Sequence, residues 1–188
     1  MFERSYLIKP FFMLFVAMLP MLITGCALSA YAGQSAYARQ SGSMVPVSSN
    51  LGGFSVMMPA NPQYTTRPIK TVSGHWVTQH VYSVESPDGR YAYFVAYNDY
   101  PYALDGEALN RACQGQADGM RGRIMRQENV SISGYSGRVV RIEGNDFIGV
   151  SQVVIVGRRL YQVMFVMPKN ANVPSEASRF LNSFEIRA

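Results

Sequence analysis

The sequence predicts an α+β fold in which a mostly antiparallel β-sheet is flanked by helices. Most of the chain after residue 50 alternates apolar and polar residues with a period of two, and two segments change to spacings of three and four. Short turn signals separate successive strand-like runs. Short turns favour antiparallel pairing, because parallel strands need crossover connections of about a dozen residues or more. Runs of strands with intervening helices are typical of the α+β class.

Three strands are expected first. The run at 52–59 alternates its apolar residues and ends at a proline, 75–85 is a longer extended run, and 90–100 is rich in aromatic residues. Pro, Asp and Gly in 86–89 form a strong turn signal.

The segment 104–120 is expected to form the first helix. Asp105 is placed to cap its start, and Glu107 suits the positive end of the helix dipole. One apolar stripe is formed by Leu104, Ala108, Leu109, Ala112, Cys113, Ala117 and Met120.

Four further strands and a second helix complete the pattern. The last two strands, 147–157 and 158–168, are expected to form a hairpin that turns near Gly157. They follow shorter runs at 128–133 and 138–144. The segment 172–188 places Pro174 in the first turn of an amphipathic helix.

The first 25 residues have the layout of a secretory signal peptide. A charged start is followed by about a dozen apolar residues, fewer than the ~20 that a spanning helix needs. Ile23 to Cys26 then resemble the lipobox of bacterial lipoproteins. The resemblance implies that Cys26 is the lipidation site and anchors the chain in the lipid bilayer. Ala27 after it implies the outer membrane, facing the periplasm. The alternative is cleavage at the A-x-A site Ala30–Ala32, which would release a soluble protein.

Residues 26–50 are expected to be a lipidated flexible tether, and 51–188 a single domain. The tether is rich in Ala, Ser, Gly and Gln and repeats "SAYAGQ" as "SAYARQ". A linker of ~24 residues has a root-mean-square reach of roughly 25–30 Å. The formal charge is +5, but its basic residues are scattered, so no nucleic-acid partner is expected.

Four phrases in the domain resemble the PsbP-like group of proteins. They are "GFSVMMPANP", "YFVAYNDYP", "GRRLYQVMFV" and "ASRFLNSFEI", which span nearly all of 52–187 in order. The resemblance implies an α/β/α sandwich with an antiparallel sheet. It also implies a protein that binds or assists another protein, since few members of the group are enzymes. It transfers no binding residue, because the matching phrases resemble core positions.

The chemistry-bearing residues indicate no catalytic site, metal site or cofactor. His75 and His80 are five residues apart in a strand, so they face opposite sides. Cys113 lies on the apolar helix stripe, where a cysteine behaves as a small hydrophobe. Asp99 and Asp105 are interpreted as turn and cap residues rather than as a catalytic pair.

The tyrosine-rich stretch 90–102 is the candidate partner-binding surface. Tyrosine combines a large apolar body with a polar tip, which suits interfaces. Tyr97, Tyr100 and Tyr102 are the candidate contact residues. The alternative is that this face of the strand packs under a helix.

The sequence therefore predicts a membrane-tethered, non-enzymatic envelope lipoprotein that binds or assists another envelope component. The alternative is an exported small-ligand-binding protein or an unrecognised hydrolase, with a cleft between sheet and helix. Buried titratable groups that converge in a pocket would favour the alternative.

Overall fold

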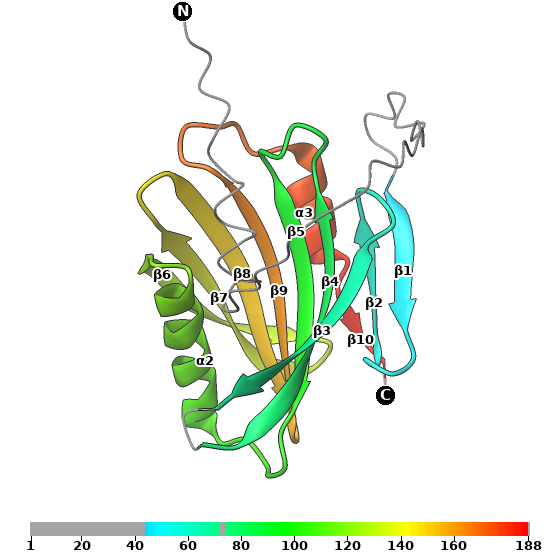
Figure 1. Ribbon diagram of the computed structural model, residues 1–188, viewed down its shortest axis with the longest axis vertical. Helices are drawn as coiled ribbons and strands as arrows, with labels where there is room; N and C mark the ends of the chain where they lie inside the picture. The colour runs from blue at the N-terminus through cyan, green and yellow to red at the C-terminus, as the bar shows by residue number, and fades with distance from the viewer. Residues whose placement is uncertain (1–43, 72–73, 188) are drawn as a thin grey trace, which may run out of the picture.

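A computed structural model describes residues 44–71 and 74–187, which form an α+β fold (Figure 1). Its elements in chain order are β1 (Val45–Ser49), β2 (Phe54–Met58), β3 (Gln63–Lys70), β4 (Trp76–Glu85), β5 (Ala92–Asp99), α2 (Gly106–Gly119), β6 (Arg123–Ile132), β7 (Tyr135–Glu143), β8 (Phe147–Val156), β9 (Arg159–Pro168), α3 (Ser175–Asn182) and β10 (Glu185–Ile186).

The described strands form two sheets. The large sheet has seven strands in the order β3-β4-β5-β9-β8-β7-β6, and the small sheet has three in the order β1-β2-β10. Each neighbouring pair is antiparallel. The prediction of a mostly antiparallel sheet with flanking helices is confirmed. The β8–β9 hairpin also turns where expected, at Gly157, whose φ of 61° lies in the left-handed region that glycine adopts without strain.

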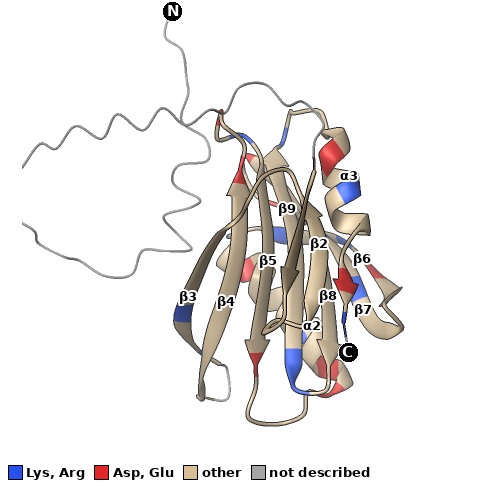
Figure 2. Cartoon of the chain, turned by 90° about the vertical axis from the view of Figure 1, so that its right-hand side faces the viewer, with Lys and Arg blue, Asp and Glu red and all other residues tan. Residues whose placement is uncertain are grey.

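The large sheet is covered differently on its two faces. Helix α2 packs against β6, β7 and β8 on one face, while the small sheet and α3 lie on the other (Figures 1 and 2). The core between the two sheets contains large aromatic side chains, including Phe54, Tyr97, Phe165 and Phe180. The core under α2 contains smaller ones, including Leu109, Cys113, Ala117, Val140 and Val153.

Helix α2 begins where the sequence predicts. The Asp105 carboxylate accepts a hydrogen bond from the Ala108 backbone N–H at 2.8 Å, which caps the helix. Leu109 and Cys113 of the predicted stripe are buried against the sheet. The side of this helix next to that buried face, described below, is lined with small residues.

Two strands were not predicted from the sequence, and β6 begins at Arg123 rather than at residue 128. β1 lies within 26–50, so the expectation of a tether up to residue 50 is wrong for residues 45–49. Val47 and Ser49 of this strand are buried, and it pairs with β2 from Val45↔Met58 to Ser49↔Phe54. The polar composition around it hides a strand that buries only alternate residues. β3 was not expected either, because most of its residues are exposed at the edge of the sheet.

The signal peptide, Cys26 and the rest of the expected tether lie outside the described residues. Among the residues that the structure describes, no helix has the length and apolar character needed to cross a membrane.

Candidate binding groove

A groove of about 690 Å³ lies between α2 and the part of the large sheet that α2 leaves uncovered. Asn98 of β5 and Leu160 and Gln162 of β9 lie along the sheet side of the groove. Residues of β3 and β4 form the side opposite α2, and Figure 1 shows the β3–β4 hairpin reaching toward that helix. Alternation along each strand decides which residues face the groove and which face the small sheet.

The α2 wall of the groove is built from small residues. Ala108, Ala112, Gly115 and Gly119 follow one another at intervals of four, three and four residues, so they share one side of the helix. A Cβ atom added at Gly115 or Gly119 would meet no atom within 4 Å. These positions therefore leave open space beside the helix. They do so although glycine in a helix interior costs about 1 kcal/mol relative to alanine.

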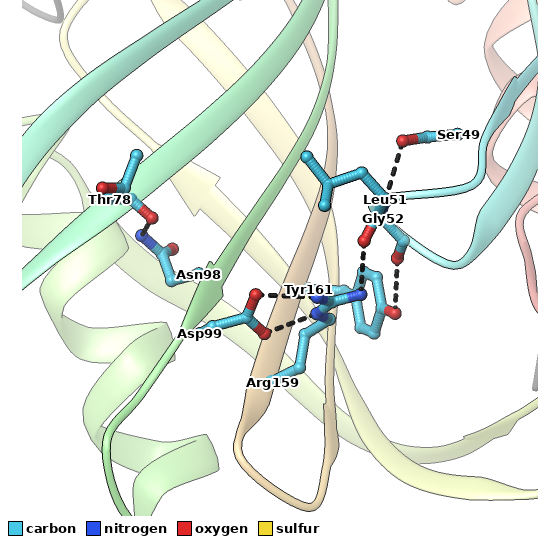
Figure 3. Close-up of polar contacts among 8 residues, drawn as sticks. All are labelled: Ser49, Leu51, Gly52, Thr78, Asn98, Asp99, Arg159 and Tyr161. Carbon is cyan, nitrogen blue, oxygen red and sulfur yellow. Dashed lines mark hydrogen bonds and ion pairs between the residues drawn. The ribbon is translucent and has the colours of Figure 1, made fainter.

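Buried carboxamides line the sheet side of the groove. Gln79 and Asn98 face each other across β4 and β5, and their exposed fractions are 5% and 1%. The Gln79 Oε1 accepts a hydrogen bond from Arg67 Nε at 2.8 Å. The Asn98 Nδ2 donates to the Thr78 carbonyl at 3.4 Å (Figure 3). These groups hold no charge and offer both donors and acceptors.

Gln116 of α2 is the least satisfied polar residue of the groove. Its side chain is 8% exposed, and its Nε2 contacts the Met164 sulfur at 3.3 Å. The carbonyl Oε1 is buried and has no hydrogen-bond partner. A buried carbonyl without a donor is costly, at about 1–3 kcal/mol. A donor at the base of the groove would remove that cost.

The charges that line the groove are positive. Arg67 and Lys70 come from β3, and Arg111 comes from α2, where it pairs with Asp105 at 2.8 Å. Burial lowers the pKa of the Arg67 guanidinium. The described residues that line the groove include no Asp, Glu, His or Cys. Figure 2 agrees with this distribution, since most of the length of β4 and β5 carries no charge.

Two of the three predicted contact tyrosines lie in this groove. Tyr100 and Tyr102 belong to the loop after β5, with ring centroids 5.9 Å apart. Tyr102 is 38% exposed. Burial, with a smaller contribution from Tyr102, raises the pKa of Tyr100. The loop thus presents two aromatic rings next to the amides and the cations.

The expectation that Tyr97 contacts a partner is wrong. Tyr97 is fully buried on the opposite side of β5, between the two sheets. Its ring stacks on His80 at 4.4 Å, and the Arg159 guanidinium lies 4.9 Å from its centroid. The odd-numbered face of this strand is a core face, covered by the small sheet and α3. This burial agrees with the alternative stated above, in which this face of the strand packs under a helix, except that the small sheet covers it together with α3.

The histidines and Cys113 occupy separate environments. His80 Nδ1 lies 2.7 Å from the Tyr64 hydroxyl, whereas the His75 ring contacts Tyr102. The Cys113 thiol is buried, and burial raises its pKa to about 11, so its predicted position in the core is confirmed. In the described part of the chain, no three His, Cys, Asp or Glu side chains are grouped so that they could hold a metal ion.

The two aspartates that the sequence singled out have structural roles. Asp105 caps α2, and Asp99 forms an ion pair with Arg159 beside a second cavity of about 290 Å³. Asn98 and Asp99 point to opposite sides of β5 (Figure 3). One strand end therefore contributes an amide to the groove and a carboxylate to the connection between the sheets.

Sequence reasoning missed the carboxamides and Arg67. One signal was present: Asn98 follows Ala92, Phe94 and Ala96 on one face of β5, and Gln79 lies between Val77 and Val81 on one face of β4. Recognising it required the β4–β5 register. Arg67 could not have been assigned, since its strand was not expected.

No family model matches the chain, and no curated protein matches it. Among solved structures, it is similar to a protein from Bacteroides thetaiotaomicron determined by crystallography at 1.50 Å resolution. The two are 14% identical, with a TM-score of 0.36, over 72% of this chain and 46% of the other. This chain thus spans less than half the length of that protein.

Proposed function

We propose that this chain is a lipid-anchored protein of the bacterial envelope that acts by binding, and that the α2 groove is its binding site. The groove carries this proposal, because it brings cations, buried carboxamides and tyrosines together around about 690 Å³. Small-molecule sites typically measure ~300–1,000 Å³ and combine apolar lining with a few placed polar groups.

The groups in the groove suit binding better than proton transfer. Carboxamides do not titrate near neutral pH, and the raised pKa of Tyr100 keeps its hydroxyl protonated there. A general acid or base instead needs a pKa near the working pH. The groove therefore offers fixed hydrogen bonds and positive charge, and we propose a non-enzymatic role.

The anchoring part of the proposal rests on the sequence. An apolar segment ends in Ile23-Thr24-Gly25-Cys26, and an acylated Cys26 would hold the domain at the periplasmic face of the outer membrane. Several acyl chains give stable attachment where one chain gives only marginal binding.

We also propose that the domain is PsbP-like. An antiparallel sheet with α2 on one face and α3 on the other supports this assignment. Three of the four resembling phrases contain most of β2, β5 and β9, and the fourth covers most of α3 and β10. On this assignment the groove belongs to a family whose members mostly bind other molecules.

In-cell photo-crosslinking tests the proposed function. A photoreactive amino acid replaces Tyr102 at the groove, and a control replaces Met125, which is 48% exposed on β6 and does not line the groove. A Gly115→Phe substitution fills the groove with a side chain. Gly106→Phe is the matched control, because it lies on the same helix outside the groove and its Cβ also meets no atom within 4 Å.

We expect an adduct from position 102 that persists with Gly106→Phe and disappears with Gly115→Phe. Equal crosslinking from positions 102 and 125, or an adduct insensitive to Gly115→Phe, would show that the groove is not the binding site.

A further inference from the structure

We propose that the ligand of the α2 groove is a short, uncharged saccharide. This inference rests on the proposed function and specifies the chemistry of its ligand. Three features of the groove lead to it: carboxamides with unused hydrogen-bonding groups, arginines that already have partners, and tyrosine rings beside them.

Carboxamides from three neighbouring strands line the groove. Gln79 of β4 lies opposite Asn98 of β5, and Gln162 of β9 lies two residues further along, opposite Ala96. Because side chains alternate between the two faces of a strand, all three lie on the groove side of the sheet. A row of amides therefore crosses the sheet side of the groove.

These carboxamides have donors and acceptors that the protein leaves unused. Among the described residues, Gln79 uses only its Oε1, Asn98 donates only one long bond of 3.4 Å from Nδ2, and Gln162 forms no side-chain hydrogen bond. A carboxamide can donate two hydrogen bonds and accept two. The unused Gln79 Nε2 and Asn98 Oδ1 are not fully buried, so a ligand in the groove can reach them.

Gln116 adds a fourth carboxamide from the α2 side. Its Nε2 contacts the Met164 sulfur, a weak acceptor, at 3.3 Å, and its Oε1 is buried without a partner. An unpaired buried carbonyl destabilises the protein. A hydroxyl group both donates and accepts, so a ligand hydroxyl beside Gln116 can satisfy either end of this side chain.

The arginines of the groove already have partners, so the groove does not call for an anion. Arg67 donates to the Gln79 Oε1 at 2.8 Å, and Arg111 pairs with Asp105 at 2.8 Å. The bond from Arg67 also orients the Gln79 amide, which leaves its Nε2 to donate to a ligand. Lys70 is exposed, and an exposed ammonium is strongly hydrated. Recognition therefore falls to the uncharged amides.

A saccharide matches this lining better than a hydrocarbon or a peptide. Each sugar hydroxyl donates one hydrogen bond and accepts two, so it fits mixed donors and acceptors. A hydrocarbon would cover the amides without pairing them, which opposes binding. An extended peptide pairs best with backbone groups along one strand edge, whereas these amides lie across three strands spaced ~4.8 Å apart.

Tyr100 and Tyr102 supply apolar surface for a sugar ring. Both line the groove with ring centroids 5.9 Å apart, and Tyr102 is 38% exposed while its ring contacts His75. The C–H groups on one face of a pyranose ring pack against an aromatic ring by dispersion. The volume of about 690 Å³ lies within the range of small-molecule sites, so the groove suits a few sugar units.

A mixed ligand array tests the proposal. The full chain, extracted from membranes in a detergent without a sugar head group, is fluorescently labelled and applied to immobilised neutral di- to tetrasaccharides, uronic-acid saccharides, random tetrapeptides and palmitate. We expect at least one neutral saccharide to retain the chain about tenfold more strongly than the peptides and palmitate do. Retention should persist with Gly106→Phe and disappear with Gly115→Phe.

A second pair of variants separates hydrogen bonding from shape. Gln162→Met removes the carboxamide and keeps a side chain of similar length, and it should weaken retention of the neutral saccharide at least about threefold, as expected for a lost hydrogen bond. Gln152→Met is the matched control, because Gln152 is also half-buried, belongs to the adjacent strand β8 and does not line the groove. Circular dichroism and the melting temperature confirm folding of every variant.

The proposal is overturned if no neutral saccharide retains the chain, if uronic-acid saccharides retain it more strongly, or if Gly115→Phe or Gln162→Met leaves retention intact. If peptides or palmitate retain the chain instead and Gly115→Phe abolishes that retention, the ligand class is wrong and the binding function stands. If crosslinking from position 102 also fails, the proposed function itself is wrong.

Discussion

Asp99 at the end of β5 and Arg159 at the start of β9 form a bidentate ion pair between two adjacent strands. Asp99 Oδ1 lies 2.6 Å from Arg159 Nε, and Oδ2 lies 2.7 Å from Nη2 (Figure 3). The third nitrogen, Nη1, donates to the Leu51 carbonyl at 3.0 Å, and the Tyr161 hydroxyl donates to the Gly52 carbonyl at 2.7 Å. The pair thereby connects the large sheet to the turn between β1 and β2.

The Asp99–Arg159 pair should make stability depend on pH in the acid range. The hydrogen bonds from Arg159 hold the pKa of Asp99 below its ordinary value of ~3.9. The stabilisation that the ion pair contributes is therefore complete above about pH 4, and it is lost as the pH falls through the folded-state pKa of Asp99. The Asp99 side chain is 54% exposed, so solvent screening limits the effect to about 1 kcal/mol.

Urea denaturation at pH 7 and pH 3 checks this prediction. Between pH 7 and pH 3, the free energy of unfolding of the wild-type protein should fall by about 1 kcal/mol more than that of the Asp99→Asn variant. A double-mutant cycle with Arg159→Gln assigns the difference to the pair. If the free energy of unfolding depended on pH in the same way in wild type and Asp99→Asn, this prediction would be contradicted.

Cys113 should be inert in the folded protein. Burial raises the pKa of its thiol to about 11, and only the thiolate reacts with disulfide reagents. In a Cys26→Ser background, 5,5′-dithiobis(2-nitrobenzoate) at pH 8 should label Cys113 only when urea unfolds the chain. Met125→Cys, on an exposed position, should react at once under native conditions. Rapid native labelling of Cys113 would show that α2 opens.

Tyr97 and Tyr102 should respond differently to truncation. Tyr97→Ala empties a fully buried site between the sheets, and we expect it to lower the free energy of unfolding by about 3–5 kcal/mol. Tyr102→Ala changes a partly exposed loop residue and should cost about 1 kcal/mol or less. Similar losses of stability in both variants would mean that Tyr102 is structural.

Cys26→Ser tests the anchor independently of the groove. If Cys26 receives the acyl chains, this substitution should move the protein from the membrane fraction to the soluble fraction and leave the signal peptide uncleaved at that site. Fractionation and mass spectrometry of the N-terminus provide the measurement. A wild-type N-terminus at Gly33 without lipid would instead establish cleavage at the A-x-A site.

Local patterns were sufficient to predict most of the elements. The alternation in β2, β4, β5, β8 and β9 and the spacing in α2 depend on which residues can be buried along one strand or helix. β3 is mostly exposed and lacks that pattern, whereas β1 buries alternate residues within a polar stretch, so neither strand was predicted.

The fold class, the Asp105 cap, the position of Cys113 in the core and the glycine turn at 157 could be predicted from sequence, because each follows from patterns among residues close together in the chain. Long-range packing sets which face of β5 is buried and which residues meet in the groove. The alternation places Tyr97 and Asn98 on opposite sides, but it does not say which side the small sheet covers. Likewise, Arg67, Asn98 and Gln116 belong to β3, β5 and α2, and long-range pairing and helix packing bring them to one site.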